Sequence, residues 1–183
     1  MLLLGRIDAL AGAKGHAELI AAWPSVISLV PDARLLFVGD GPGLGAARVL
    51  AAASPVAASI EVRGHVAEQN IPALWRAAHL LAMPSRKEGF GIVYAEAMRC
   101  RLPVLASVHD AGQEINVHGK TGLNVNLDNE GELADTLISL LRSPERLQQF
   151  GEAGHLRWQT HFRPSCFNDR FLQIIAEFVR STS

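Results

Sequence analysis

The sequence predicts an α/β fold, a Rossmann-like doubly wound parallel sheet of about six strands with a C-terminal helical tail. Short apolar runs bounded by Gly, Pro or polar residues alternate with helical patterns, and such runs are typical of parallel strands buried on both faces. After about residue 128 the pattern becomes wholly helical. With 183 residues, 49% of them hydrophobic, the chain is long enough for one domain with its own core.

Six runs are predicted to be buried strands: Leu2–Arg6, Ala33–Gly39, Ile60–Gly64, Leu80–Met83, Pro103–Ala106 and the short Leu123–Val125. Helical patterns between them cover residues 14–29, 43–53, 68–78 and 91–100. In the tail, residues 128–183, apolar side chains repeat at helical spacing, as at Phe171, Ile174, Ile175 and Phe178. We therefore expect a single domain over residues 1–183.

Composition excludes several classes of function. The net charge of -1 does not favour nucleic-acid binding, which needs concentrated basic charge. No apolar run reaches the ~18 residues of a transmembrane segment. The two cysteines are far apart and lack metal-ligand spacing, which indicates a reduced, cytoplasmic protein without a metal site. Asp128-Asn129-Glu130 precedes a helical pattern, so we expect it to cap that helix rather than to bind a metal ion.

Ligands of doubly wound folds bind where the carboxyl ends of strands meet helix N-termini. In the first such loop, Arg6 is expected at a strand end and Lys14 in the first turn of a helix. A cation in that turn opposes the helix dipole, which favours anions there. One hypothesis is that both residues converge on a diphosphate held by backbone amides. The alternative is two solvated side chains on a loop.

The second loop contains a match to a dinucleotide-binding fingerprint. Gly41, Gly43 and Ala46 fit G-x-G-x-x-[GA], and Glu61 follows at about the distance of a ribose contact. The fingerprint belongs after the first strand of its unit, whereas this loop follows the second, and Pro42 interrupts it. A glycine-rich turn that admits a ligand or a close helix is at least an equal alternative to NAD-type binding.

The third loop, residues 84–96, is the most informative. Glu88 and Glu96 are eight positions apart, and two glycines stand between them. Glycines let a backbone approach a ligand, and the uncapped amides of Phe90–Val93 would face outward as donors to an anion. Glu88 would then accept from neutral hydroxyls beside the anion, and Glu96 from a ribose diol. The alternative is a capping acid and a solvated helix acid.

In this order and spacing, the loops resemble the C-terminal, donor-binding half of the retaining GT-B glycosyltransferases of the "group 1" family, which use nucleotide-sugars. The motifs that carry the resemblance are Gly5-Arg6…Lys14-Gly15-His16, Val38-Gly39-Asp40-Gly41-Pro42, Pro84-Ser85…Glu88-Gly89-Phe90-Gly91…Glu96-Ala97-Met98, Pro103-Val104 and Gly119-Lys120-Thr121-Gly122-Leu123. They extend from about residue 2 to 162, and the paired-Glu segment is the most specific part.

The resemblance implies roles for individual residues. Arg6, Lys14 and Glu88 would be catalytic, with Arg6 and Lys14 on the donor's β-phosphate and Glu88 on the sugar hydroxyls. Glu96 would bind the ribose, the amides of Phe90–Val93 the phosphate and sugar, and Gly64–Val66 the base. The implied donor-binding set is Gly5, Gly41, Gly64, His65, Val66, Phe90, Gly91, Ile92, Val93 and Glu96. The substrate would be a UDP-sugar or GDP-sugar, without a cofactor or metal.

The chain departs from the family pattern in two places. Paired glycines, two residues and Glu usually follow the fifth strand, but here the run is Asp110-Ala111-Gly112-Gln113-Glu114, so the role of Glu114 stays open. GT-B enzymes also have an N-terminal domain that binds the acceptor and supplies a catalytic His. This chain begins in the first strand of the second domain, so we expect the acceptor domain to be absent.

These departures lead to a prediction for the isolated chain: it binds the nucleotide-sugar donor but does not transfer the sugar to its acceptor, which is unknown. Homodimerisation or association with an acceptor-binding domain is expected. The alternatives are a non-catalytic subunit or remnant acting with a partner chain, and an NAD-type dinucleotide-binding domain.

Overall fold

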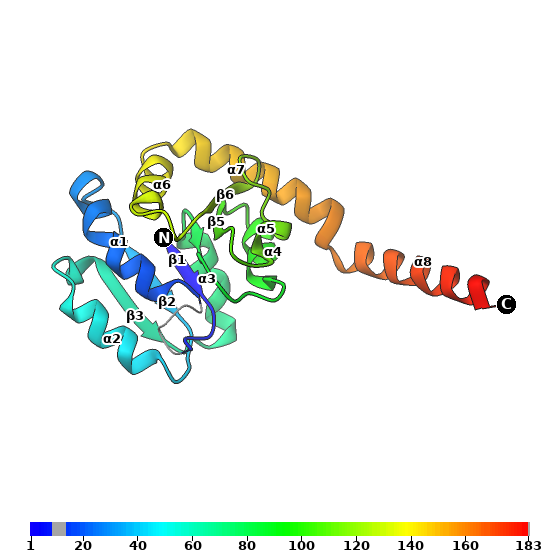
Figure 1. Ribbon diagram of the computed structural model, residues 1–183, viewed down its shortest axis with the longest axis horizontal. Helices are drawn as coiled ribbons and strands as arrows, with labels where there is room; N and C mark the ends of the chain where they lie inside the picture. The colour runs from blue at the N-terminus through cyan, green and yellow to red at the C-terminus, as the bar shows by residue number, and fades with distance from the viewer. Residues whose placement is uncertain (9–13, 183) are drawn as a thin grey trace.

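The computed structural model describes residues 1–8 and 14–182, which form a six-stranded parallel sheet with helices on both faces (Figure 1). The strands are β1 (Leu2–Leu4), β2 (Leu35–Val38), β3 (Ile60–Gly64), β4 (Leu81–Ala82), β5 (Val104–Ser107) and β6 (Gly122–Val125). Their order is β3-β2-β1-β4-β5-β6, and every neighbouring pair is parallel. The predicted fold class is confirmed.

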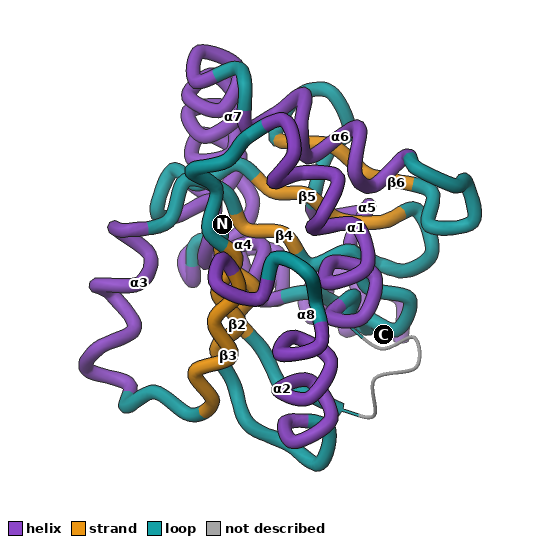
Figure 2. Tube along the Cα trace, turned by 90° about the vertical axis from the view of Figure 1, so that its left-hand side faces the viewer, coloured by secondary structure: helices purple, strands orange, loops and turns teal. Residues whose placement is uncertain are grey.

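The α-helices are α1 (His16–Leu29), α2 (Leu44–Ala53), α3 (Ile71–Ala77), α4 (Ile92–Arg99), α5 (Gly112–Ile115), α6 (Glu132–Leu141), α7 (Pro144–Arg157) and α8 (Pro164–Thr182). Figure 2 shows α1 and α6 on one side of the strands and α3 on the other. All predicted helices are present with ends shifted by a few residues. The short α5 is an additional element, because four residues are too few to show a helical period.

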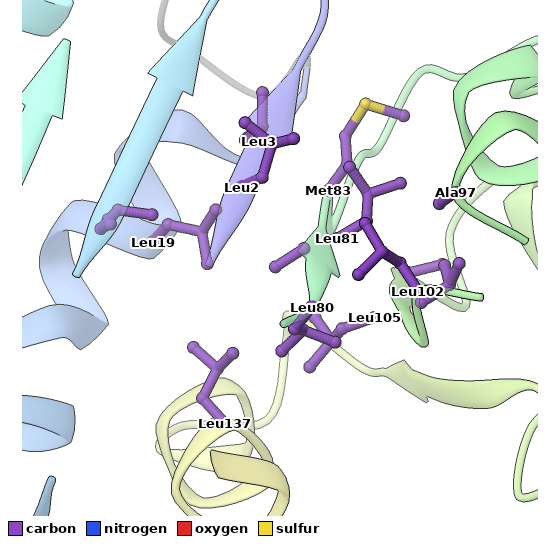
Figure 3. Packing of buried hydrophobic residues seen from close by; sticks show 14 of the residues in the cluster. Leu2, Leu3, Leu19, Leu80, Leu81, Met83, Ala97, Leu102, Leu105 and Leu137 are labelled. Carbon is purple, nitrogen blue, oxygen red and sulfur yellow. The ribbon is translucent and has the colours of Figure 1, made fainter. Parts of the chain in front are cut away.

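The sheet is buried on both faces, which explains why its strands read as continuous apolar runs. Leu2 and Leu3 of β1 point to opposite faces, yet each is at most 1% exposed. Leu81 of β4 is fully buried beside them, and Figure 3 shows Leu19 of α1 and Leu137 of α6 in the same core. Burial of both faces is therefore what holds the sheet between its helices.

The strand order reverses between β1 and β4. From β1 the chain adds β2 and β3 on one side, and it then crosses to place β4 on the other side of β1, where Leu2 pairs with Leu81. At such a switch point the loops that follow the two strands diverge to opposite faces and leave a crevice at the carboxyl edge. The loop after β1 and the loop after β4 therefore flank the expected ligand site.

The glycine-rich loop after β2 packs directly on the loop after β1. Ile7 N–H donates to the carbonyl of Asp40 at 2.9 Å, and Gly43 N–H donates to the carbonyl of Ile7 at 2.9 Å. A Cβ at Gly43 would lie 1.8 Å from the carbonyl oxygen of Asp8, and one at Gly41 would lie 2.3 Å from that of Ile7. The glycines are required by this close approach of two backbones, so the fingerprint match has an explanation that involves no dinucleotide.

The helical tail has two parts. Helix α7 packs against α4, and α8 extends away from the body of the molecule (Figure 1). The predicted stripe of α8 is exposed at Phe171, Ile174, Ile175 and Phe178. Within residues 1–8 and 14–182, no helix is both long and apolar enough to cross a membrane.

Candidate functional site

A pocket of about 250 Å³ lies at the switch point of the sheet. Its walls come from the end of β1, the loop after it, the loop after β4 and the start of α4. The residues that line it are Leu4, Gly5, Lys14, Met83, Glu88, Phe90, Gly91, Ile92 and Val93. From the sequence, seven of these residues were predicted to contact the donor. The other two are apolar: Leu4 is the last residue of β1, and Met83 directly follows β4.

Lys14 and Glu88 form an ion pair within this pocket. Their side chains are only 18% and 14% exposed, so the pair is largely screened from water. Gly15 makes the arrangement possible: its φ is +85°, and a Cβ there would lie 2.6 Å from the carbonyl oxygen of Pro84. The close contact between Gly15 and Pro84 brings Lys14 beside the loop that carries Glu88.

The expected position of Lys14 in a helical turn is wrong. Gly15 is the N-cap of α1 in the left-handed conformation, and the helix begins at His16. Lys14 therefore precedes the helix. Its positive charge therefore does not lie within the first turn of α1, where we expected it to oppose the helix dipole.

The main chain of Glu88 is held on both sides by the loop after β5. Its N–H donates to Asp110 Oδ2 at 2.9 Å, and its carbonyl accepts from Ala111 N–H at 3.3 Å. The other carboxylate oxygen of Asp110 accepts from Gly112 N–H at 2.9 Å. Glu88 is thus fixed through its backbone by one loop and through its carboxylate by Lys14.

Helix α4 begins at the pocket. Its N-cap is Gly91, with φ +85°, and the described side chains provide no cap. A Cβ at Gly91 would lie 2.3 Å from the ring of Tyr94, whose hydroxyl donates to the carbonyl of Met83 at 2.7 Å. Burial raises the pKa of Tyr94, and the charges of Asp110 and Glu88 act in the same direction. The positive end of the α4 dipole therefore faces the pocket, where it favours an anion.

Glu96 lies in an adjoining groove of about 490 Å³ between α3 and α4. Leu4 lines both hollows, so the groove and the pocket meet at the end of β1. Burial raises the pKa of the Glu96 carboxyl, and the nearby charge of Arg99 acts against this increase. Glu68 and Arg76 also line the groove, together with apolar side chains such as Trp75.

The remaining predicted residues lie outside the pocket as the described residues define it. Arg6 is 69% exposed and pairs with Asp8 at 2.6 Å. It is not at a strand end, because β1 ends at Leu4. Gly41 packs on Ile7, and the segment Gly64, His65 and Val66 begins at the end of β3, two strands away from β1.

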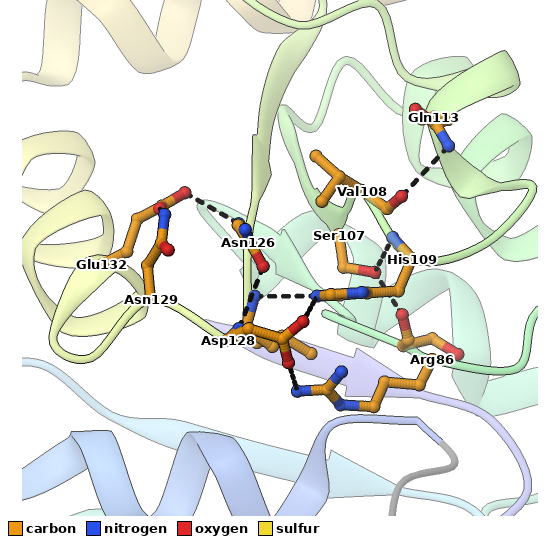
Figure 4. A network of polar contacts seen from close by, with 11 residues as sticks. Arg86, Ser107, Val108, His109, Gln113, Asn126, Asp128, Asn129 and Glu132 are labelled. Atoms are coloured by element: carbon orange, nitrogen blue, oxygen red, sulfur yellow. Dashed lines mark hydrogen bonds and ion pairs between the residues drawn. The ribbon is translucent and has the colours of Figure 1, made fainter.

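A polar network connects the loop after β4 to the loops after β5 and β6 (Figure 4). Arg86 pairs with Asp128 at 2.8 Å, and this contact lowers the pKa of the Asp128 carboxyl. His109 Nε2 accepts from Leu127 N–H at 3.0 Å, and Ser107 Oγ donates to the carbonyl of Ser85. The network holds the first residues of the loop that carries Glu88.

Helix capping by Asp128-Asn129-Glu130 is a wrong expectation. The N-cap of α6 is Gly131, and no side chain of the described residues caps it. Asp128 instead pairs with Arg86, 42 residues away, a contact that local spacing does not encode.

The loop after β5 departs from the family pattern, and the structure gives the positions of two of its residues. Glu114 lies in α5, and its carbonyl accepts from Arg157 at 2.8 Å. Asp110 contacts the Glu88 backbone and was not singled out from the sequence, although its departure from the family's glycine was a usable signal.

A parallel sheet covered by helices on both faces, with a pocket at its switch point, is the arrangement of doubly wound domains that bind nucleotides. The chain matches the family model described as "Glycosyl transferases group 1" over residues 3–157 and belongs to that family. The fold is that of the C-terminal domain of a GT-B glycosyltransferase.

The relatives of this chain include GDP-mannose-dependent mannosyltransferases of Corynebacterium and Mycobacterium. A GDP-mannose-dependent monoacylated alpha-(1-6)-phosphatidylinositol monomannoside mannosyltransferase of Corynebacterium glutamicum is 34% identical over 88% of this chain and 44% of its own length. A GDP-mannose-dependent alpha-(1-6)-phosphatidylinositol monomannoside mannosyltransferase of Mycobacterium tuberculosis is 36% identical over 80% of this chain and 40% of its own length. The chain thus spans less than half the length of these relatives.

Solved structures have the same fold. Anabaena Alr3699/HepE in complex with UDP superposes with a TM-score of 0.81 at 23% identity, over 96% of this chain and 48% of the other. The C-terminal domain of a glycosyl transferase group 1 family protein (LpcC) from Francisella tularensis gives 0.74 at 23% identity, over 89% and 86% of the two chains.

Proposed function

We propose that this chain binds a nucleoside diphosphate sugar and forms the donor half of a retaining glycosyltransferase. The observation that carries the proposal is the Lys14–Glu88 pair in a pocket at the N-terminus of α4. A cation and a helix N-terminus suit the diphosphate, and a carboxylate can accept hydrogen bonds from sugar hydroxyls.

The diphosphate is the leaving group of the proposed reaction, and the developing negative charge on it must be stabilised. Lys14 and the amides at the start of α4 are preorganised to do this without moving far. Hydrogen bonds to charged groups contribute about 1.5–3 kcal/mol each. In the proposed complex Arg6 would have to leave Asp8 to join them.

A carboxylate beside a diphosphate is unfavourable unless a cation compensates it. Lys14 compensates Glu88 in this structure, and the same pair leaves the carboxylate of Glu88 able to accept from sugar hydroxyls. Glu96, in the adjoining groove, is assigned to the ribose diol. The base would extend toward Gly64–Val66. GDP-mannose is the first donor to test, because the Corynebacterium and Mycobacterium relatives are named for it.

Sugar transfer also needs an acceptor held in line with the donor. We assign the acceptor site to a further domain or partner chain, since this chain spans less than half the length of its relatives. The isolated chain would then bind the donor without transferring sugar. The two free cysteines, Cys100 and Cys166, support a reducing, cytoplasmic location for this reaction.

Calorimetric titration of the chain with GDP-mannose, UDP-glucose and NAD tests the proposal. A sugar nucleotide is expected to bind more tightly than NAD, and Lys14→Ala is expected to weaken that binding by about 10-fold or more. Lys120→Ala is the matched control, because Lys120 is an exposed lysine in the turn before β6. Binding that is unaffected by Lys14→Ala, or a preference for NAD, would refute the donor site.

A transfer assay separates the domain hypothesis from an autonomous enzyme. The chain is incubated with radiolabelled GDP-mannose and a mixture of phosphoinositide acceptors, and labelled product is measured. No product is expected from the chain alone. Sugar transfer by this chain without a second chain would contradict the assignment of the acceptor site elsewhere.

A further inference from the structure

We infer that Asp110 is a positioning residue for Glu88 and thereby for the donor sugar. The inference deepens the proposed function and rests on it. The two carboxylate oxygens of Asp110 accept from Glu88 N–H and Gly112 N–H, each at 2.9 Å. Among the described residues, Asp110 makes no hydrogen bond with Lys14 or with the first residues of α4. It acts on the pocket through the main chain of Glu88.

The geometry makes Asp110 a bridge between two loops. Ala111 N–H donates to the Glu88 carbonyl at 3.3 Å, so both polar groups of the Glu88 peptide are bound by consecutive residues of the loop after β5. Gly112 allows this approach, because a Cβ there would lie 2.8 Å from the ring of Tyr94 and 3.0 Å from Asp110 Oδ1. Gly112 therefore packs against Tyr94, the same residue that packs against Gly91 at the start of α4.

Only a group with two acceptors satisfies both amides. An ionised Asp accepts at each oxygen, whereas Asn offers one acceptor and one donor of the same size. In Asp110→Asn one N–H would face another N–H, and the Glu88 peptide or the Gly112 peptide would lose its partner. Because catalytic and binding groups must be held within about 0.5 Å of their productive positions, a shift of the Glu88 backbone moves its carboxylate off the sugar hydroxyls.

The charge of Asp110 fits a positioning role better than a role in binding the diphosphate. A second carboxylate close to the diphosphate would repel it, and Lys14 already compensates Glu88. The Asp110 carboxylate accepts instead from two backbone donors, Glu88 N–H and Gly112 N–H. We therefore expect its removal to affect the sugar and not the nucleotide.

The test measures the gain in affinity from the sugar, as the ratio of the Kd values of the nucleoside diphosphate and its sugar derivative for the intact chain. Titrations with GDP and GDP-mannose, or with UDP and UDP-glucose if that donor binds, provide the ratio. Asp110→Asn is expected to reduce it by about 10-fold, with the Kd of the diphosphate changed by less than about threefold. A merely structural role would weaken both ligands together.

Two further variants make the result specific. Gln113→Ala removes the exposed amide that donates to the carbonyls of Val108 and Asp110 in the loop after β5, leaves both carboxylate contacts of Asp110 in place, and is expected to leave the ratio unchanged. In the double variant Asp110→Asn with Glu88→Gln, the ratio is expected to equal that of Glu88→Gln alone, since Asp110 acts through Glu88. If Asp110→Asn does not fold, Asp110→Ser, which keeps one short acceptor, carries the same test.

The outcomes separate the inference from the function on which it rests. A wild-type chain that gains no affinity from the sugar contradicts the proposed donor site and the inference with it. A wild-type gain that survives in Asp110→Asn, or that Gln113→Ala removes equally, overturns only the role of Asp110. A reduced ratio in Asp110→Asn that the double variant does not deepen supports positioning through Glu88.

Discussion

Lys14 and Glu88 stand 74 positions apart in the chain and form an ion pair in the pocket between the ends of β1 and β4. The pair joins the two loops that diverge at the switch point of the sheet, and the contact of Gly15 with Pro84 brings them together. Each charge compensates the other in a site where water has little access. Any ligand that binds here must therefore engage both charges or separate them.

Glu88→Gln is expected to have opposite effects on two ligands. Removal of the negative charge leaves Lys14 free for a diphosphate, so the nucleoside diphosphate should bind as well as before or more tightly. The sugar derivative should lose about 10-fold, because a charged acceptor for its hydroxyls becomes a neutral one. Calorimetry measures both affinities. Glu152→Gln, which removes the exposed partner of Arg101, is the control and should change neither.

Gly91→Ala should destabilise the protein and weaken donor binding. A non-glycine residue at φ +85° costs about 1–2 kcal/mol, and the added Cβ would meet the Tyr94 ring at 2.3 Å. Urea unfolding measures the change in free energy. Gly89→Ala is the matched control, since a Cβ there meets no atom within 4 Å. Equal effects of the two substitutions would show that the contact with Tyr94 does not hold the start of α4.

Two neighbouring glycines should respond to alanine with opposite signs. At Gly43 the new Cβ would lie 1.8 Å from the Asp8 carbonyl, so unfolding free energy should fall by more than 2 kcal/mol, as expected for overpacking against backbone. At Gly45, inside α2 with open space around it, the substitution should stabilise by up to about 1 kcal/mol. Thermal or urea unfolding of both variants measures the two changes in unfolding free energy. A stable Gly43→Ala that has lost nucleotide binding would favour a ligand role for the loop.

His16 should make the protein less stable as the pH falls from about 6.5 to 4. Its side chain is buried, and Nε2 has no hydrogen-bond partner among the described residues. Burial, and then the charge of Lys14, lower the His16 pKa to about 4, while Asp8 acts in the opposite direction. In this window the unfolded chain binds a proton that the folded chain does not, so unfolding free energy should fall by up to about 1.4 kcal/mol per pH unit.

Urea unfolding at pH 7.5 and pH 5 measures this dependence. His16→Leu removes the titrating group and should flatten the pH profile, while His161→Leu, at an exposed position, serves as the control. A wild-type profile as flat as that of His16→Leu would contradict protonation-linked destabilisation by this residue.

The glycines show how far local sequence reaches. The fingerprint match at Gly41 and Gly43 left open a dinucleotide or a glycine-rich turn, and in the structure these glycines let two loops pack backbone to backbone. The same residue type at Gly15 has a φ of +85° and a contact with Pro84, two constraints that a sequence pattern does not distinguish from ligand approach. A glycine in a motif indicates a close contact at that position. Only the fold shows whether the contact is with a ligand or with another segment of the chain.

By itself the sequence determined the alternation of buried strands and helices, because the period of apolar residues is a local property set by backbone geometry. It also predicted that Lys14, Glu88 and the start of α4 share one site, and these residues line one pocket. The tertiary structure decided which of the predicted residues meet. Strand order placed the ends of β1 and β4 side by side, paired Lys14 with Glu88, left Arg6 with Asp8 and brought Asp110 to the Glu88 backbone. Such pairings depend on contacts between distant segments, and these exist only once the hydrophobic core has fixed the sheet.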